Sequence, residues 1–367
     1  MYTKFCDIFQ TKHEYASTHN RQNVIGYICS MAPEEVVYAA GFLPVRVMGS
    51  NKMQTVSDAY IPAIFCSHCR DILAQGLQGK YNYLKGLVHT TSCEKMRSAF
   101  DSWQRHVSGS NTYYLWMPQV LNKDAEETYF AEVCRFKQQF ENDWQVSISD
   151  ENLFQAITVY NENRRLMRKI YELTQKVPSP VSGKELVSMS LAGQIMDKAE
   201  HSIIVKEFIE NVQQRDVDED DEEARVMLIG NSSGGLELVQ LLDSLGAKIV
   251  VDETCFGLRY FSEEINYTDN PLKAISQKYV TGMPCPVKDT SLPRKRIPFI
   301  VDLARRYNVQ FAILVYPAFC DPHVYDNPLI HETLIEEGIK VLEIAEDFPL
   351  PVGQLRTRIE ATLESVC

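Results

Sequence analysis

The sequence predicts an α/β fold with two parallel-sheet domains that face each other across a helical connection. In both halves of the chain, short apolar segments rich in β-branched residues alternate with segments of helical period. This alternation is typical of βαβ units, in which the strands run parallel. The stretch between the halves has helical period only. We therefore expect an N-terminal α/β domain at 1–147, a helical connection at 148–223 and a C-terminal α/β domain at 224–367.

The elements of the first domain include a short helix between Pro33 and Gly41. Proline suits the first turn of a helix, and glycine commonly follows the last turn. The residues directly after this helix are apolar and β-branched, as expected of a buried strand. Two further apolar runs follow, each after a stretch of helical period. The predicted strands lie at 42–48, 86–91 and 112–117.

The connecting region is predicted to be helical up to an acidic linker. Ser149 followed by three polar residues is typical of a helix start, and apolar residues recur at helical spacing from there towards Pro178. More helix is predicted from 183 to 214. The run 216–223 contains seven acidic residues and is predicted to be a solvated linker.

The second domain opens with another βαβ unit and ends with a helix. Its strands are predicted at 225–230, 247–251, 311–317 and 340–345. A helix at 234–245 connects the first two of these strands. Residues 354–366 carry apolar side chains at helical spacing, so we expect this last helix to pack on the sheet.

Length, charge and composition exclude several classes of protein. A chain of 367 residues is too long for a small disulfide scaffold. The net charge is −12, and because seven acidic residues lie in 216–223 the rest of the chain carries only −5. No basic excess is left to neutralise phosphates, which argues against nucleic-acid binding. The sequence contains no apolar run of the roughly 18 residues that a membrane helix needs and no secretory signal, so we expect a cytoplasmic protein.

The ten cysteines are too few for a disulfide framework in a chain of this size, so we expect reduced thiols. Cys66, Cys93 and Cys320 lie where predicted strands or apolar segments pass into loops. In parallel α/β folds, such loops are where ligands bind. We therefore expect thiolates from both domains to converge on one metal centre in the cleft between them. Soft thiolate ligands suit zinc or an iron–sulfur cluster.

A zinc site within one domain is an alternative. Cys66, Cys69, His89 and Cys93 follow the spacing Cys-x2-Cys and His-x3-Cys, which suits a four-ligand structural site. His89 falls inside a predicted buried strand, however, where a lone histidine is more often a core residue. From spacing alone, zinc and iron–sulfur remain about equally favoured. We assign structural roles to the cysteines outside these patterns, which are Cys6, Cys29, Cys134 and Cys367.

A glycine-containing loop at 230–235 leaves a predicted strand and enters a helix, and Asp252 and Glu253 follow the next strand. A dinucleotide would bind at such a place. The glycines occupy the first, fifth and sixth positions of the loop, however, and the dinucleotide pattern is Gly-x-Gly-x-x-Gly. A tight turn with Ser232 or Ser233 as the helix cap is therefore favoured.

Two groups of charged residues are predicted to have structural roles only. Glu34 and Glu35 lie in the first turn of a predicted helix, where carboxylates interact favourably with the helix dipole. Four arginines lie close to strand ends or cysteines, and each is predicted to form a surface ion pair. They are Arg46, Arg70, Arg97 and Arg259.

Several short motifs are uninformative one by one but indicate a family when they occur together. They occur in order across nearly the whole chain, and they include FCSHCR at 65–70, SCEKMR at 92–97 and FCDPH at 319–323. The other matching segments lie at 26–46, 81–88 and 353–361. In this combination the chain resembles the catalytic subunits of benzoyl-CoA reductases and 2-hydroxyacyl-CoA dehydratases.

The resemblance implies two Rossmann-like domains, a helical part and a 4Fe-4S cluster in the cleft between the domains. It implies Cys66, Cys93 and Cys320 as the cluster ligands, with one iron left open to substrate or solvent. This favours an iron–sulfur cluster over zinc. Ser30 lies in a motif that approaches the cluster in relatives, so the resemblance implies a hydrogen bond from Ser30 to the open-site ligand or to the thioester oxygen.

The resemblance also implies an activity. Members of the family deliver single low-potential electrons to a CoA thioester, work with a related second catalytic subunit, and receive electrons from an ATP-hydrolysing iron–sulfur activator. The segments 252–261 and 282–286 look more like the smaller benzoyl-CoA reductase subunits than like dehydratases. We therefore expect an iron–sulfur subunit of an ATP-dependent benzoyl-CoA reductase.

Three other functions stay open. The first is a subunit of a 2-hydroxyacyl-CoA dehydratase. The second is a small-molecule reductase with two linked cubane clusters, to which Cys69, Cys255 and Cys285 would contribute the additional thiolates. The third is a zinc-stabilised binding protein without catalytic activity.

Overall fold

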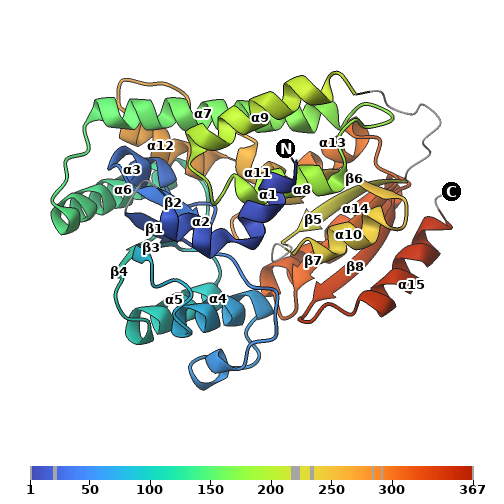
Figure 1. Cartoon of the computed structure of the whole chain (residues 1–367), viewed down its shortest axis with the longest axis horizontal. Helices are drawn as coiled ribbons and strands as arrows, with labels where there is room; N and C mark the ends of the chain where they lie inside the picture. The colour runs from blue at the N-terminus through green and yellow to red at the C-terminus, as the bar shows by residue number, and fades with distance from the viewer. Residues whose placement is uncertain are drawn as a thin grey trace.

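The computed structural model describes residues 2–19, 23–215, 224–231, 235–282, 285–290 and 292–365. Within this part of the chain, two separate four-stranded sheets are each flanked by helices (Figure 1). Every strand pair in both sheets is parallel. The predicted α/β fold with two parallel sheets is therefore confirmed.

The first sheet has the strand order β2-β1-β3-β4. Its strands are β1 (Val24–Tyr27), β2 (Leu43–Arg46), β3 (Leu84–Thr90) and β4 (Asn111–Leu115). The sequence predicts three of them but not β1, which is buried inside the sheet. β1 has only four residues and contains Gly26, which weakens its strand signal. A Cβ atom on Gly26 would lie 2.7 Å from Leu84 Cδ1, so the close packing here requires glycine.

The second sheet has the strand order β6-β5-β7-β8. All four strands agree with the prediction to within a few residues. They are β5 (Ala224–Gly230), β6 (Ala247–Thr254), β7 (Phe311–Pro317) and β8 (Lys340–Glu346). The inner strand β5 is buried along its whole length, which explains its continuous apolar run. At the end of β5, Gly230 has a φ of 127°, and a Cβ atom there would lie 2.1 Å from the Val315 carbonyl oxygen.

Helices flank the first sheet and the loops around it. They are α1 (Tyr2–Gln10), α2 (Lys12–Thr18), α3 (Glu34–Ala39), the short 3-10 helix η1 (Val56–Ala59), α4 (Ser67–Leu77), α5 (Glu94–His106) and α6 (Lys123–Trp144). The helix predicted between Pro33 and Gly41 corresponds to α3.

Three helices form the connection between the two sheets. They are α7 (Asp150–Leu173), α8 (Gly183–Ala192) and α9 (Lys198–Val212). The predicted start of α7 is confirmed by a capping box, in which the Ser149 hydroxyl accepts from the backbone of Asn152 and the Asn152 side chain accepts from the backbone of Ser149. α7 packs against α3 of the first half and α11 (Leu258–Phe261) of the second half. It therefore spans both halves along the upper side of the molecule in Figure 1.

The remaining helices belong to the second half of the chain. They are α10 (Glu237–Asp243), α11, α12 (Pro271–Thr281), α13 (Arg296–Arg306), α14 (Asp321–Glu336) and α15 (Val352–Leu363). The predicted helices at 234–245 and 354–366 correspond to α10 and α15. Ser232 and Ser233, predicted as caps of α10, and the acidic run 216–223 lie outside the described residues.

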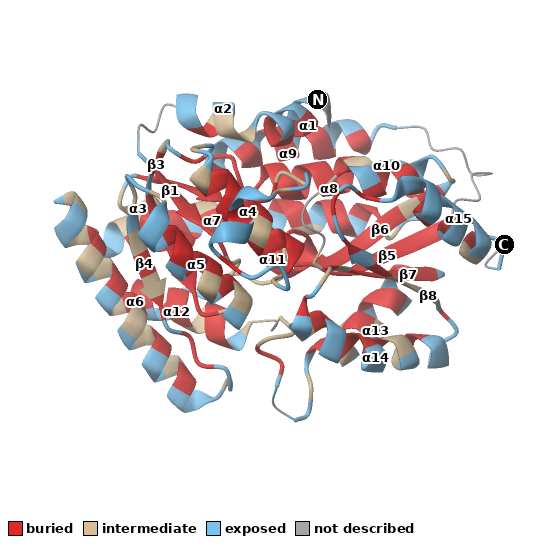
Figure 2. Ribbon diagram, turned by 90° about the horizontal axis from the view of Figure 1, so that it is seen from below, coloured by how far each residue is buried: buried red, intermediate tan, exposed pale blue. Residues whose placement is uncertain are grey.

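The two halves interlock through their helices. α1 packs against α8, and α12 returns from the second half to pack against α6 and α7. One hydrophobic core contains buried side chains from both sheets, such as Leu87 of β3 and Leu228 of β5. Figure 2 shows this buried layer running through the sheets, with exposed residues on the outer faces of the helices. The boundaries at 147 and 223 remain a prediction.

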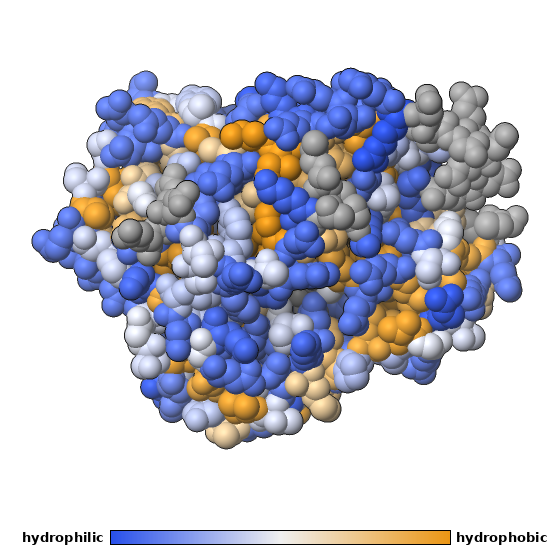
Figure 3. Space-filling view, in the orientation of Figure 1, coloured by the Kyte–Doolittle hydropathy of each residue, from blue (hydrophilic) through white to orange (hydrophobic). Residues whose placement is uncertain are grey.

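The outer surface is mainly polar on the face shown in Figure 3, where hydrophilic side chains cover most of α7 and α9. Smaller apolar areas interrupt this cover. Among the described helices, none combines the length and the apolar character that crossing a membrane requires.

Candidate functional site

Three of the predicted ligands occupy the same position in three helices. Cys66 is the N-cap residue of α4, Cys93 that of α5 and Cys320 that of α14. α5 and α14 begin shortly after the carboxyl ends of β3 and β7, where parallel folds bind ligands. The first N–H groups of a helix have no partner within the helix and favour negative charge nearby. Each of these thiols therefore lies at a helix start, where unpaired N–H groups favour nearby negative charge.

Hydrogen bonds join the sulfur atoms at two of these helix starts. Cys66 Sγ donates a hydrogen bond to Cys69 Sγ at 3.1 Å. Hydrogen bonds with Cys66 and Cys93 raise the pKa of Cys69, whereas the hydrogen bond with Cys69 lowers the pKa of Cys93 to about 7. Burial raises the pKa of Cys320, and negative charge on Cys66 or Cys93 raises it further. We call these four residues the first thiol set.

The first thiol set has the donor chemistry of a soft-metal site, but three of its members, Cys66, Cys69 and Cys93, are hydrogen-bonded to one another. Among the described residues, no three His, Cys, Asp or Glu side chains are already arranged around one metal position. Metal binding requires deprotonated thiols, so a metal centre would replace the hydrogen bonds that now join these sulfur atoms. Thiolate ligands suit zinc or iron–sulfur clusters. The donor set therefore fits an iron–sulfur cluster in chemistry.

A cavity that is open to solvent lies next to the first thiol set. Cys93 and Cys320 line it, whereas Cys66 and Cys69 are buried and do not. The cavity is also lined by Cys29, Cys255 and Cys285, which we call the second thiol set. We call this space the thiol-lined cavity.

The second thiol set differs from the sequence-based assignment. The sequence analysis gave Cys29 a structural role and grouped Cys69 with Cys255 and Cys285. Cys29 lines the cavity, where burial raises its pKa to about 11 and negative charge on Cys285 contributes. Cys255 Sγ donates to Asn231 Oδ1 at 2.9 Å. No other cysteine lies near Cys29 in sequence, so spacing did not indicate its position at the cavity, and its structural role stays a prediction.

The other cysteines with an assigned structural role do not line the cavity. Cys6 Sγ lies 3.0 Å from Ser188 Oγ in the core between α1 and α8. Cys134 lies on α6 and packs at the edge of a separate hydrophobic cluster. Cys367 lies outside the described residues.

The four arginines near strand ends prove to have different environments. Arg70 pairs with Asp58, and both side chains are partly exposed. Arg97 is half exposed and close to Glu94. Arg46 and Arg259, by contrast, are buried and line the thiol-lined cavity, so the prediction of surface ion pairs is wrong for both. The distance of an arginine from a strand end in the sequence does not indicate whether its side chain is buried.

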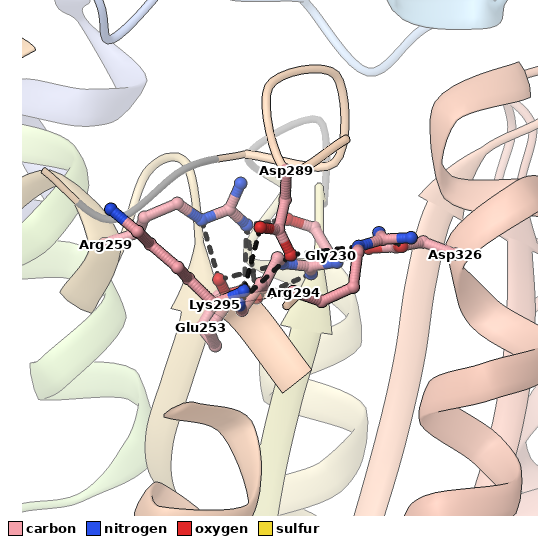
Figure 4. Close-up of polar contacts among 8 residues, drawn as sticks. Gly230, Glu253, Arg259, Asp289, Arg294, Lys295 and Asp326 are labelled. Carbon is pink, nitrogen blue, oxygen red and sulfur yellow. Dashed lines mark hydrogen bonds and ion pairs between the residues drawn. The ribbon is translucent and has the colours of Figure 1, made fainter. Parts of the chain in front are cut away.

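A buried ion-pair network holds the wall of the cavity to which Arg259 belongs (Figure 4). Glu253 of β6 pairs with Arg259 at 2.8 Å and with Arg296 at 2.7 Å. Arg296 also contacts Asp326 of α14, which pairs with Arg294 in turn. The carboxylates of this network are fully used, so Glu253 is not free to bind the ribose of a dinucleotide.

Asp252, the other carboxylate of the possible dinucleotide site, is buried and accepts a hydrogen bond from the Tyr171 hydroxyl. Burial raises the pKa of Asp252 to about 7, although this hydrogen bond opposes the shift. Both acidic residues near the end of β6 therefore have partners inside the protein. Residues 232–234 lie outside the described part of the chain, so a turn at 230–235 stays a prediction.

Glu34 and Glu35 lie in the first turn of α3, as predicted, and they also have partners in other helices. Both are buried, and Glu35 forms an ion pair with Arg164 of α7. Glu34 accepts from Tyr260 Oη at 2.8 Å and lies 3.5 Å from Lys198 Nζ. These contacts connect α3 to α7, α9 and α11, which the position in the helix alone did not indicate.

Ser30 lies three residues after β1 and lines the thiol-lined cavity. It also lines a smaller adjoining cavity together with Glu263 and Lys278. Burial and the nearby positive charge of Arg164 lower the pKa of Lys278 to about 7. The predicted position of Ser30 beside the cysteines agrees with this arrangement, while its hydrogen bond to a bound ligand stays a prediction.

His89 is a core residue. Its ring lies 5.1 Å from that of Phe100 and 5.8 Å from that of Tyr114, measured between centroids. Burial lowers its pKa to about 3, so the ring is neutral at ordinary pH. Within the described residues, His89 and the neighbouring cysteines do not form a ready-made metal group.

Comparison with known proteins shows the family to which the chain belongs. The family model described as 2-hydroxyglutaryl-CoA dehydratase, D-component, matches residues 29–366. The chain belongs to this family. The resemblance inferred from the spaced motifs is thereby confirmed.

Three relatives each match 90% or more of the chain. It is 26% identical to the (R)-phenyllactyl-CoA dehydratase beta subunit of Clostridium sporogenes, over 100% of this chain and 98% of the relative. It is 23% identical to a benzoyl-CoA reductase subunit of Thauera aromatica, over 90% of this chain and 87% of the relative. It is 25% identical to the lactoyl-CoA dehydratase beta subunit of Anaerotignum propionicum, over 94% and 91%. All three relatives are named as subunits of enzymes, and both reaction types occur among them.

Proposed function

We propose that the chain is the iron–sulfur subunit of an enzyme that passes single low-potential electrons to a CoA thioester. Cys66, Cys93 and Cys320 would hold a 4Fe-4S cluster. The observation that carries this proposal is the shared N-cap position of these three cysteines, two of which, Cys93 and Cys320, line one cavity. Membership of a family with dehydratase and reductase subunits supports it.

When bound, an iron–sulfur cluster supplies one-electron transfer at low potential. The chain contributes the thiolates, the helix N-termini near their charge, and a cavity beside them that opens to solvent. Ser30 would donate its hydroxyl hydrogen to the thioester oxygen and so orient the substrate at the cavity. Lys278 lines the smaller adjoining cavity together with Ser30, and its amino group would hold a proton near Ser30.

Two reactions fit this proposal, and both begin with electron transfer to a CoA thioester. Ring reduction of benzoyl-CoA is favoured by the segments 252–261 and 282–286. Dehydration of a 2-hydroxyacyl-CoA is favoured by the number of dehydratase subunits among the relatives. We lead with benzoyl-CoA reduction and treat the dehydratase as its direct competitor. Either reaction would need a related second catalytic subunit and an ATP-hydrolysing activator.

A second candidate function follows from the second thiol set. Cys29, Cys255 and Cys285 line the same cavity as Cys93 and Cys320. Two sets of thiols around one cavity suit a pair of linked cubane clusters. In that case the chain would be a small-molecule reductase without a CoA substrate.

Metal analysis of the anaerobically purified chain tests both candidates. About four irons per chain support the single cluster, and about eight support the linked pair. A colourless protein with one zinc per chain would contradict both and support the zinc-stabilised binding protein. Reconstitution with the partner subunit, activator and ATP, followed by parallel assays with benzoyl-CoA and a 2-hydroxyacyl-CoA, then separates reductase from dehydratase.

A further inference from the structure

Cys69 is the member of the first thiol set for which the proposed function has no ligand role. It lies in the first turn of α4 and is fully buried. Cys66, the N-cap residue of the same helix, precedes it by three residues. An N-cap side chain commonly meets the third residue of the helix that it caps. The sulfur atoms of Cys66 and Cys69 accordingly lie 3.1 Å apart.

This pair of thiols needs little movement to form a disulfide. The sulfur atoms of a disulfide are bonded at about 2.05 Å, so the two atoms would have to approach each other by only about 1 Å. Both side chains come from one turn of one helix, and no second element has to shift. The spacing Cys-x-x-Cys is also that of redox-active cysteine pairs.

Cys93 connects this buried pair to the thiol-lined cavity. It is partly exposed and lines the cavity, whereas Cys66 and Cys69 do not. A hydrogen bond joins Cys93 to Cys69. Cys69 is therefore hydrogen-bonded to a buried thiol on one side and to a cavity thiol on the other. An oxidant that enters the cavity meets Cys93 first and has a second thiol directly behind it, as is typical of redox-sensitive sites.

We propose that Cys66 and Cys69 form a reversible disulfide in the metal-free chain, and that Cys93 is the thiol through which a peroxide oxidises this pair. The inference rests on the proposed function, because Cys66 and Cys93 are ligands of the cluster proposed there. The disulfide blocks cluster assembly under oxidising conditions. It also keeps the Cys66 sulfur in a form that a thiol reductant can restore.

The oxidation proceeds in three balanced steps. Hydrogen peroxide transfers one oxygen to Cys93 Sγ, which becomes a sulfenic acid, and water leaves. Cys69 Sγ then attacks Cys93 Sγ, and the sulfenic hydroxyl leaves as a second water with the proton of the Cys69 thiol. Cys66 Sγ attacks Cys69 Sγ, the bond between Cys69 and Cys93 breaks, and the Cys66 proton passes to Cys93. In sum, two thiols lose two electrons and two protons, and peroxide is reduced to two waters.

Peptide masses of the metal-free chain test this product. Trypsin leaves Cys66 and Cys69 together in the peptide 53–70 and Cys93 in the peptide 86–95. After treatment of the reduced chain with hydrogen peroxide and then with an alkylating reagent, 53–70 should be lighter by two hydrogens and carry no label. Cys93 should be labelled. Dithiothreitol added before alkylation should restore the labels on Cys66 and Cys69.

Cys69→Ser removes the partner thiol and keeps its size. The variant, kept reduced, should bind as much iron as the wild type when iron and sulfide are supplied. After peroxide, its Cys93 has no thiol to trap the sulfenic acid and should be oxidised to sulfinic acid, which dithiothreitol does not reduce. The wild type should therefore regain iron binding after dithiothreitol, whereas Cys69→Ser should lose it permanently.

Two further variants complete the comparison. In metal-free Cys93→Ser, the Cys66–Cys69 disulfide should form more slowly than in the wild type, because the thiol at the cavity is gone. Cys134→Ser is the matched control. It also removes a partly buried thiol, but one on α6 outside the cavity. It should form the disulfide and regain iron binding as the wild type does.

The outcomes separate this inference from the proposed function. A reduced wild-type chain that binds no iron refutes the proposed function, while the peptide masses still decide the disulfide. Iron binding by the reduced chain, with Cys66 and Cys69 both still labelled after peroxide, refutes the disulfide alone. A final cross-link between Cys69 and Cys93 refutes it as well. These readings use the wild-type chain and do not depend on the folding of a variant. Loss of iron from reduced Cys69→Ser would show that Cys69 is a ligand and overturn its role as the disulfide partner.

Discussion

Lys95 Nζ lies 2.8 Å from Asp321 Oδ1 and thereby joins the starts of two helices that carry cysteines at their N-caps. The same ammonium group donates to the Phe319 carbonyl oxygen at 2.5 Å. Lys95 follows Cys93 by two residues, and Asp321 follows Cys320 directly. One lysine therefore bridges loops from the two sheets at the position where their thiols must act together.

Removal of this ion pair should speed the release of iron from the site, with only a small loss of stability of the whole protein. Lys95→Met should reduce stability by only about 0.5–1 kcal/mol, because the pair is partly exposed. Loss of iron during a chelator challenge should be clearly faster, since Cys93 and Cys320 are then held less firmly. Iron release followed by absorbance measures this effect. Lys137→Met, which breaks a comparable pair with Glu141 on α6, is the control and should leave iron release unchanged.

Phe319, next to Cys320, has a strained backbone. Its φ is 65°, in the left-handed region that costs a residue with a side chain about 1–2 kcal/mol. Its side chain is 55% exposed, so truncation loses little apolar burial. We expect Phe319→Gly to be about 1 kcal/mol more stable than Phe319→Ala, because only glycine relieves the strain. Denaturant unfolding of both variants tests this, and equal stability or the reverse order would contradict it.

Asp252 should make the stability of the protein depend on pH. Burial raises its pKa to about 7 in the folded state, whereas a carboxyl of this kind titrates near 4 when unfolded. Its contribution to stability is therefore complete below about pH 4 and is lost as the pH rises to about 7, with a slope of at most about 1.4 kcal/mol per pH unit.

Asp252→Asn should remove this slope. The difference in unfolding free energy between wild type and variant, measured at several pH values, isolates the one group from all other titrations. The wild type should lose stability relative to the variant between about pH 4 and pH 7. A constant difference over this range would mean that the carboxyl is already ionised in the folded protein at low pH.

The sequence was sufficient to predict the parallel strands of both sheets but not β1. The strands that were predicted have apolar runs, and such a run indicates a buried strand. β1 has four residues and a central glycine, and that glycine is required only because Leu84 lies against it. A local pattern contains no information about such a neighbour.

The part of the candidate site that could be predicted consists of residues that directly follow a strand in the sequence. Cys93 and Cys320 follow strands of the sheets, and this position is visible in the sequence. Arg46 was misassigned, because its environment depends on partners far away in the chain. Arg46 meets Cys255 across 209 positions, and whether an arginine finds a carboxylate in the folded state is decided by tertiary structure.

The central claim, that Cys66, Cys93 and Cys320 hold an iron–sulfur cluster, is tested most directly by iron and sulfide analysis of single variants. Cys66→Ala, Cys93→Ala and Cys320→Ala should each lose about four irons per chain relative to the wild type when purified without oxygen. Cys134→Ala, a cysteine on α6 outside the cavity, should lose none. Full wild-type iron in Cys320→Ala would contradict the account.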